Sequence, residues 1–174
     1  GFATFFLNRT NRSGILLGGV IGGKEQNGKW KIDARFNKVD LVNRIKVIAD
    51  RKSDICIYNQ DAKSFLQNTV TGFPLKTLLY LDPPYYVKGK GLYQNHYSHD
   101  DHVEIANIIK SNSKHPWIVS YDNTVEINNM YTGLRKIEYG ISYSAQSRYQ
   151  GPEVIFFCDS ISIPDDMDPT RVKL

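Results

Sequence analysis

The apolar positions of this chain change their spacing several times, and each change predicts a different element. Between residues 39 and 52, apolar side chains recur every three or four positions among charged ones, which predicts an amphipathic helix. Residues 76–81 end in a continuous apolar run, which is typical of a central parallel strand covered on both faces. A second strand is expected at 116–121. Segment 98–111 opens with a serine and, three positions later, an aspartate, which is a capping signal for a helix.

Shorter signals complete the expected order of elements. We expect a strand at 55–58, a brief helix at 62–67, a helix at 123–131, and a terminal antiparallel pair at 134–144 and 154–161. Residues 1–38 are expected to be irregular, because six glycines fall between positions 14 and 28. Strands that alternate with helices and end in a hairpin predict an α/β fold, with a mostly parallel sheet and a C-terminal antiparallel hairpin.

The distribution of charge adds a candidate partner. The chain has 174 residues, enough for one domain with its own core, and a net charge of +4. Residues 1–38 hold seven Lys and Arg residues against two acids, and Lys88 and Lys90 form a second cluster among tyrosines. Cations beside aromatic residues and glycines suit a surface that follows a nucleic-acid backbone, although ordinary solvated loops would have the same composition.

Two further features of the sequence, its cysteines and its apolar runs, bear on the expected cellular location. The two cysteines lie far apart in apolar surroundings, and we expect both to be small buried residues in a reducing compartment. No apolar run approaches the roughly 20 residues that span a bilayer. We therefore expect a soluble, cytoplasmic protein with no membrane partner.

Three carboxylates directly follow predicted strands, namely Asp61, Asp82 and Asp122. Ligands of α/β sheets bind at the carboxyl ends of the strands, so these side chains are expected to line one edge of the sheet. The alternative for Asp61 and Asp122 is an ordinary cap of the helix that follows each of them.

The tetrapeptide Asp82-Pro83-Pro84-Tyr85 has the chemistry of a binding site for an amino group. Its carboxylate accepts hydrogen bonds, and the two prolines stiffen the backbone and remove two N–H donors, so that carbonyl oxygens dominate. If Asp82 and the Pro83 carbonyl accept both hydrogens of an adenine amine, the lone pair of its nitrogen is aimed at an electrophilic methyl group. If this adenine belongs to duplex DNA, it must first leave the duplex, and we expect it to stack on the ring of Tyr85. The alternative is a turn that merely ends a strand.

Several segments together resemble the Dam-type family of DNA adenine N6-methyltransferases. They are "LLYLDPPY", "FFLNRTNRSG" with "KIDARFNK", "ICIYNQDAKSFL" and "WIVSYDNT". The resemblance implies a Rossmann-like methyltransferase sheet, S-adenosylmethionine as cofactor, double-stranded DNA as substrate, and a cognate restriction enzyme as a further candidate partner. It implies that Asp61 bonds the adenine amine of the cofactor and that Asp82 lies beside the cofactor. The side chains expected to contact DNA are Asn8, Arg9, Arg12, Arg35, Asn37, Tyr86, Lys88 and Lys90.

The chain departs from that family at the cofactor loop. The resemblance implies a glycine-rich turn after a first strand, and the glycines at 18–19 and 22–23 follow no predicted strand and open no helix. We therefore expect a member that is incomplete at its N-terminus. Its expected parts are a DNA-contacting, target-recognition segment at 1–38, the C-terminal part of the catalytic domain at 39–164, and a tail at 165–174.

Other functions remain open at this point. The same pocket would suit an enzyme that methylates cytosine, RNA or a protein glutamine, and a chain without the cofactor loop would be an inactive DNA-binding remnant. His96, His99 and His102 recur every three residues near two aspartates, which is compatible with zinc. Methyl transfer needs no metal, and we expect none.

Overall fold

A computed structural model of the chain describes residues 1–87, 97–112, 114–143 and 149–164. Within it, the chain divides into two compact units. The first unit is Gly1–Asn59, and the second unit begins at Gln60 and contains the sheet. Each unit is described by itself.

The first unit begins with a helix that the sequence interpretation missed. Helix α1 spans Phe2–Thr10, so the prediction of irregular structure throughout 1–38 is wrong there. The glycines that argued against a helix all follow this segment, and Phe2, Phe5 and Phe6 have helical spacing. The rings of Phe5 and Phe6 lie 6.3 Å and 5.6 Å from that of Phe36, which fixes the helix against the later loop. A 3-10 turn, η1 (Arg12–Gly14), follows α1.

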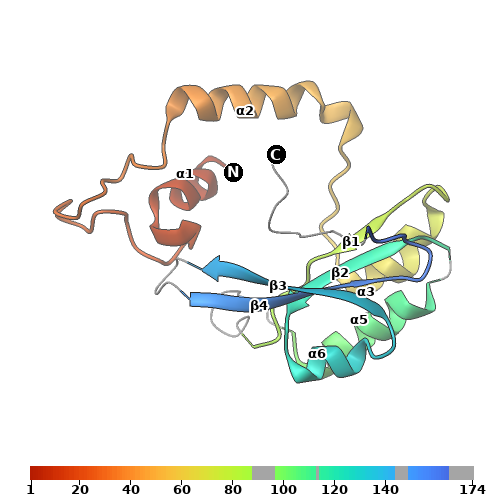
Figure 1. Cartoon of the computed structure of the whole chain (residues 1–174). Helices are drawn as coiled ribbons and strands as arrows, with labels where there is room; N and C mark the ends of the chain where they lie inside the picture. The colour runs from red at the N-terminus through yellow and green to blue at the C-terminus, as the bar shows by residue number, and fades with distance from the viewer. Residues whose placement is uncertain (88–96, 113, 144–148, 165–174) are drawn as a thin grey trace. The chain divides into compact units, whose positions relative to one another are not determined.

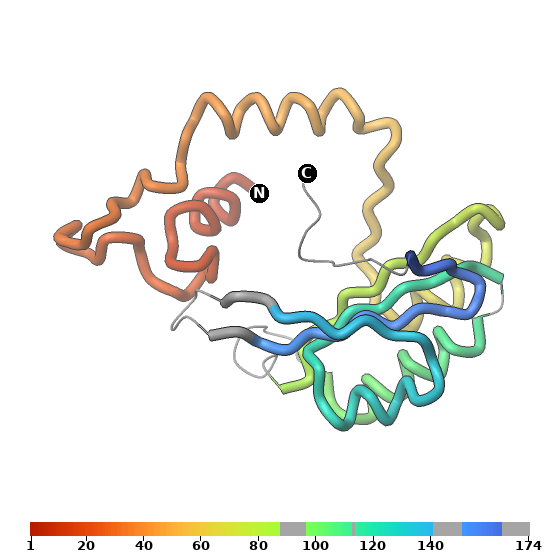
Figure 2. The backbone as a smooth tube through the Cα atoms, viewed as in Figure 1, coloured from red at the N-terminus to blue at the C-terminus, as the bar shows by residue number. Residues whose placement is uncertain are grey.

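The predicted helix at 39–52 is confirmed as α2, Lys38–Asp50, followed by the turn η2, Lys52–Asp54. Asn37 caps α2 by accepting the backbone N–H of Asp40. The expected strand at 55–58 is wrong, because the chain is extended there but pairs with no described strand (Figure 2). Cys56 is consequently exposed rather than buried, whereas Cys158 is buried as expected. No helix among the described residues is long and apolar enough to cross a membrane.

The second unit is a mixed α/β structure (Figure 1). Its sheet has four strands in the order β1-β2-β4-β3, with β1 paired parallel to β2 and both other pairs antiparallel. Its elements are, in chain order, α3 (Ala62–Ser64), η3 (Phe65–Thr69), η4 (Val70–Gly72), β1 (Leu79–Leu81), α5 (His99–Ser111), β2 (Trp117–Asp122), α6 (Val125–Met130), β3 (Arg135–Tyr143) and β4 (Tyr149–Phe157).

The sheet differs from the predicted one in two respects. It is not mostly parallel among the described strands, because only one of its three strand pairs is parallel. Among the strands that the structure describes, β1 lies at the edge of the sheet rather than at its centre, and its Tyr80 is 61% exposed. An apolar run shows that a strand can be buried on both faces, but it does not identify the neighbours that would bury it.

The two faces of the sheet have different compositions. Helices α5 and α6 lie along one face (Figure 1). There, alternate residues of β2 and β4 pack with Ile109 of α5 and Ile127 of α6. The other face of β1, β2 and β4 is mixed: it carries Tyr80, Ser120, Asp122 and Glu153 beside Ile118, Ile155 and Phe157. On the helix-covered face the strand residues are Leu79, Leu81, Trp117, Val119, Tyr121, Val154 and Phe156.

Helix α5 begins with the predicted capping box between Ser98 and Asp101, and it buries His102 on its inner face. Only 1% of His102 is exposed, and its Nδ1 lies 3.1 Å from the hydroxyl of Tyr121 in β2. Burial lowers the pKa of His102, although the negative charges of Asp122 and Asp101 oppose this effect. The imidazole is therefore held in its neutral form inside the unit.

We expect this burial to make the stability of the second unit depend on pH. In the unfolded chain His102 regains an ordinary pKa of about 6.5, so below that pH the unfolded state binds more protons than the folded state. The contribution of His102 is thus fully present above about pH 6.5 and is lost as pH falls through its lowered folded pKa. Urea unfolding of the wild type and of His102→Asn between about pH 7.5 and pH 5 measures it. The wild type should lose more stability than the variant on acidification, and equal losses would contradict the assignment.

Candidate functional site

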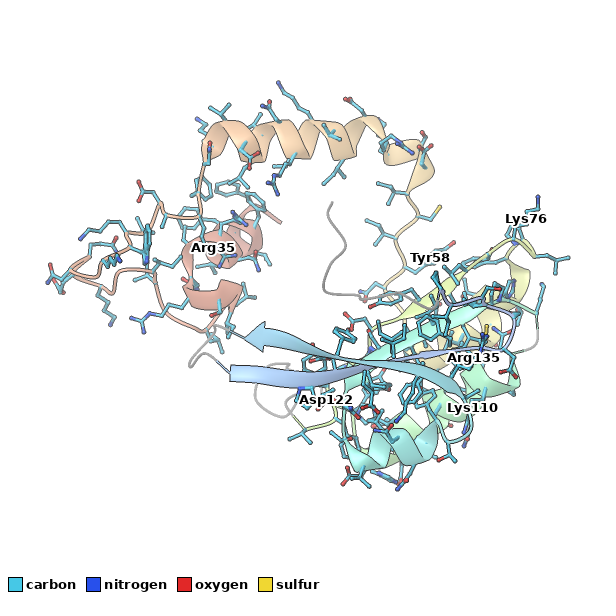
Figure 3. The ribbon with its side chains drawn as sticks, viewed as in Figure 1. Arg35, Tyr58, Lys76, Lys110, Asp122 and Arg135 are labelled. Carbon is cyan, nitrogen blue, oxygen red and sulfur yellow. The ribbon has the colours of Figure 1, made fainter. Side chains whose placement is uncertain are left out.

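The carboxyl ends of β1 and β2 bring the predicted acids together. Because the two strands are parallel and Leu81 pairs with Val119, the residues that follow them emerge at the same edge of the sheet. Asp82 comes directly after β1, and Asp122 is the last residue of β2 (Figure 3). The expected alignment of these two carboxylates is therefore confirmed.

Two linked hydroxyl groups, those of Ser120 and Tyr80, hold one oxygen of the Asp82 carboxylate. The hydroxyl of Ser120 donates to Oδ1 of Asp82 at 3.1 Å and lies 2.9 Å from the hydroxyl of Tyr80. A serine hydroxyl has one hydrogen, so Tyr80 must donate to Ser120 while Ser120 donates to Asp82. The second oxygen, Oδ2, accepts no hydrogen bond from a described residue, and the residue is exposed. One oxygen thus fixes the carboxylate, and the other can accept a hydrogen from a ligand.

Asp122 holds the other end of the loop that begins at Asp82, segment 82–87. Its Oδ1 accepts the backbone N–H of Tyr86 at 2.8 Å, and its Oδ2 accepts that of Val87 at 3.0 Å. The side chain is almost completely buried, so water does not compete for these bonds. The alternative of an ordinary helix cap is wrong for Asp122, because Thr124 caps α6 by accepting the N–H of Ile127.

Between these two anchors lie Pro83, Pro84 and Tyr85, all partly buried. The prolines restrict the backbone torsion angles and contribute no N–H group. The carbonyl of Pro83 accepts no hydrogen bond from a described residue. The segment therefore has an unbonded carbonyl one residue after Asp82, on a backbone that β2 holds at both ends.

Behind the loop lies a cluster of aromatic rings. The ring of His102 lies 5.3 Å from those of both Tyr86 and Tyr97, and the Tyr86 hydroxyl lies 2.9 Å from Nδ1 of His99. The ring, hydroxyl and N–H group of Tyr86 have partners within the unit. Its expected contact with DNA stays a prediction. The cluster supports the segment 82–87 from the side of α5.

Asp61 lies close to the same cluster. Burial raises the pKa of the Tyr97 phenol, and the nearby negative charges of Asp61 and Asp101 raise it further. Oδ1 of Asp61 caps the short helix α3 by accepting the N–H of Ser64 at 3.1 Å. No strand precedes Asp61, so the expected strand end is wrong, although the capping alternative is confirmed. Its Oδ2 accepts no hydrogen bond from a described residue, which fits an amino group of a cofactor; that contact stays a prediction.

The residues expected to contact DNA in the first unit have mixed surroundings. Arg12 is exposed, while Arg9 and Arg35 (labelled in Figure 3) are partly buried. Nε of Arg9 donates to the carbonyl of Arg35 at 2.8 Å. Asn8 donates to the carbonyl of Gly14, and Asn37 is occupied as the cap of α2. Their contacts with DNA stay predictions. Lys88 and Lys90 lie outside the described residues, as does His96.

Among the described residues, no three His, Cys, Asp or Glu side chains gather in an arrangement that could hold a metal ion. His99 and His102 instead bond to Tyr86 and Tyr121 respectively. Both histidines therefore have structural partners within the second unit.

The sequence interpretation missed three residues on the face of the sheet that α5 and α6 do not cover: Tyr80, Tyr139 and Glu153. Glu153 is buried and pairs across the strands with both Asp122 and Tyr139. Burial raises the pKa of Tyr139, with smaller effects from Glu153, Tyr80 and Asp82, so these groups lie near one another. The available signal was the spacing of two between Tyr80 and Asp82, because residues two apart in an extended strand share a face.

Comparison with known proteins gives one family match. The model of the D12 class N6 adenine-specific DNA methyltransferase family matches residues 4–146, which include Asp82, Asp122 and all of the first unit from residue 4 to Asn59. No curated protein matches the chain.

Replacing Asp122 should loosen the loop without removing any exposed group. Asp122→Asn keeps the size of the side chain but leaves one of the two backbone N–H groups without an acceptor, which typically costs about 1–3 kcal/mol of unfolding free energy. Amide hydrogen exchange at Tyr86 and Val87 should accelerate in this variant.

Asp159→Asn is the matched control, because Asp159 is exposed in the same unit. Its unfolding free energy should stay within about 0.5 kcal/mol of the wild type. Unchanged exchange at Tyr86 and Val87 in Asp122→Asn would show that the carboxylate does not hold these amides.

Proposed function

Since this chain belongs to the D12 class N6 adenine-specific DNA methyltransferase family, we propose that it methylates the exocyclic amine of an adenine extruded from DNA, with S-adenosylmethionine as methyl donor. The observation that best supports this proposal is the arrangement at Asp82. One carboxylate oxygen is fixed by Ser120, the residue is exposed, and two prolines that stiffen the backbone follow it directly.

The amine is held by two acceptors. Oδ2 of Asp82 accepts one hydrogen of the adenine amine, and the carbonyl of Pro83 accepts the other. In free adenine the nitrogen lone pair is delocalised into the ring, so the nitrogen is a weak nucleophile. Two acceptors draw the nitrogen toward tetrahedral geometry and localise the lone pair outside the ring plane. This is positioning together with stabilisation of the positive charge that grows on nitrogen.

S-adenosylmethionine, when bound, supplies a methyl group on a positively charged sulfonium. It would supply the electrophilic carbon for the adenine nitrogen and would leave as a neutral thioether that keeps the electrons of the carbon–sulfur bond. The nitrogen is then positively charged and acidic, so it releases a proton. Asp82 already accepts one of these hydrogens and passes it to solvent, because the residue is exposed.

Asp61 is our candidate for holding the cofactor. Its Oδ2 is oriented by the hydrogen bond of the neighbouring Oδ1 to the N–H of Ser64, so it is a preorganised acceptor for the amine of the cofactor's adenine. The proximity of Asp61 to Tyr97, which packs on His102, connects it to the cluster behind segment 82–87.

Tyr85 is our candidate for receiving the extruded base. A base inside a duplex cannot reach the pocket, so it must leave the stack, and an aromatic face compensates part of the lost stacking. Tyr85 follows the two prolines directly and precedes the residues anchored by Asp122, so its backbone is held on both sides.

Asp82→Ala tests the central role. Removal of the carboxylate should lower kcat by at least about 100-fold, the usual loss when one preorganised partner of a developing charge is removed. Binding of S-adenosylmethionine, measured by titration calorimetry, should stay nearly unchanged if Asp82 acts mainly on the target base. Methyl transfer is measured as N6-methyladenine formed in DNA by mass spectrometry.

Asp159→Ala serves as the control, since it removes an exposed carboxylate of the same unit and should keep wild-type activity. Substantial activity in Asp82→Ala would disprove the role of the carboxylate. A wild-type chain that neither binds S-adenosylmethionine nor methylates DNA would favour the inactive remnant over the enzyme.

Tyr85 is tested by a pair of substitutions. Tyr85→Ala should lower kcat/KM for DNA by about 5- to 150-fold, which corresponds to the roughly 1–3 kcal/mol of one stacking contact. Tyr85→Phe keeps the ring and should be much milder. Equal losses in the two variants would assign the effect to the hydroxyl and would refute a stacking role.

A further inference from the structure

The loop of the first unit between η1 and α2 extends away from both elements (Figure 2). It carries an exposed tryptophan, Trp30. Trp30 is 66% exposed, although tryptophan has one of the largest apolar surfaces of any residue. The Lys29 ammonium lies 5.7 Å from the centre of its ring. Beside the ring is a hollow of about 340 Å³, lined by Arg12, Ile21, Gly22, Gly23, Gly28, Lys29 and Trp30.

The loop is held in one shape by Gln26. The side-chain amide of Gln26 donates to the carbonyls of Ile21 and Gly23 at 2.8 Å and 2.7 Å, and its oxygen accepts the N–H of Ile32 at 2.8 Å. The backbone N–H of Gly28 also donates to the carbonyl of Gly22 at 3.0 Å. The exposed ring is therefore on a preorganised loop, which lowers the entropy lost when a ligand binds.

Glycine is required where the loop closes on itself. A Cβ atom on Gly22 would come within 2.7 Å of the carbonyl oxygen of Trp30, and one on Gly28 within 2.9 Å of the Cα of Gly22. Gly22 also has φ of +88°, in the left-handed region. Glycine at these two positions thus lets the loop close on itself, and three glycines, at 22, 23 and 28, line the hollow beside the ring.

The charges around the ring favour an anionic ligand with a flat aromatic part. Arg12 and Lys29 both line the hollow and both are exposed. Residues 1–38 as a whole carry seven cations against two acids. An apolar protein partner would use the ring but not the cations, whereas free phosphate would use the cations but not the ring.

From these observations we propose that Trp30 stacks on an unpaired DNA base while Arg12 and Lys29 hold the adjoining phosphates. This deepens the proposed function, because base extrusion leaves unpaired bases in the duplex, and it rests on DNA being the substrate. Trp30 belongs to the first unit, whereas Asp82 belongs to the second.

Tryptophan fluorescence gives a direct test on the chain itself. The chain has two tryptophans, and Trp117 is only 2% exposed, so a ligand in solution can quench mainly Trp30. The probe is a DNA duplex with one bulged adenine, compared with the fully paired duplex and with inorganic phosphate. We expect saturable quenching that is strongest with the bulged duplex and absent with phosphate.

Two variants separate the ring from the charges, with affinities measured by fluorescence anisotropy of labelled DNA. Trp30→Ala should weaken binding of the bulged duplex by about 5- to 150-fold and leave the salt dependence unchanged, while Trp30→Phe should bind nearly as well as the wild type. Arg12→Ala should instead lower the slope of log K against log salt by about one, as expected for one lost phosphate contact.

Equal affinity of Trp30→Ala and the wild type for the bulged duplex would overturn the inference but leave the proposed methyl transfer intact. Absence of DNA binding by the wild type would overturn both. Fluorescence that changes with protein concentration alone, together with self-association in sedimentation, would show that Trp30 binds a second copy of the chain instead.

Discussion

The candidate site depends on strand β2 holding both ends of one loop. Ser120 and Asp122 lie two residues apart on β2, so they share a face. Ser120 donates to the carboxylate of Asp82, while Asp122 accepts the N–H groups of Tyr86 and Val87. A proline-rich loop has few N–H groups for securing itself to a sheet, so anchors from the neighbouring strand must replace them. The stiffness of the segment thus comes partly from the prolines and partly from β2.

The two faces of the sheet have different roles, one in the stability of the second unit and the other in the candidate site. The helix-covered face of the sheet is apolar and supplies the core, whereas the other face carries the acids and tyrosines of the candidate site among several apolar residues. His102 links the core to the loop that carries the candidate site. It is buried on the inner face of α5, and its ring lies beside that of Tyr86, whose N–H group donates to Asp122. Acidification therefore acts on the support of the loop as well as on the core.

The sequence predicted features that depend on neighbouring residues better than it predicted which distant elements pack or pair with one another. The cap of α5 at Ser98 and the periodicity of α2 depend on neighbouring residues, and both are confirmed. The position of β1 at the edge depends on which strands pair with it, and hydrophobicity does not encode that choice. The aspartate at 122 could be recognised as important, but only the structure distinguishes a helix cap from an anchor of a distant loop. Helix α1 was missed because later glycines outweighed its aromatic spacing.

The central claim is that Asp82 and Pro83 hold an extruded adenine by its amine. The most direct measurement is a crystal structure of the protein with adenine-containing duplex DNA and a non-reactive analogue of S-adenosylmethionine. The account predicts an adenine outside the helix, its N6 within about 3 Å of Oδ2 of Asp82 and of the Pro83 carbonyl oxygen. A target adenine still paired in the duplex, or an Asp82 carboxylate turned away and paired with a cation, would contradict it.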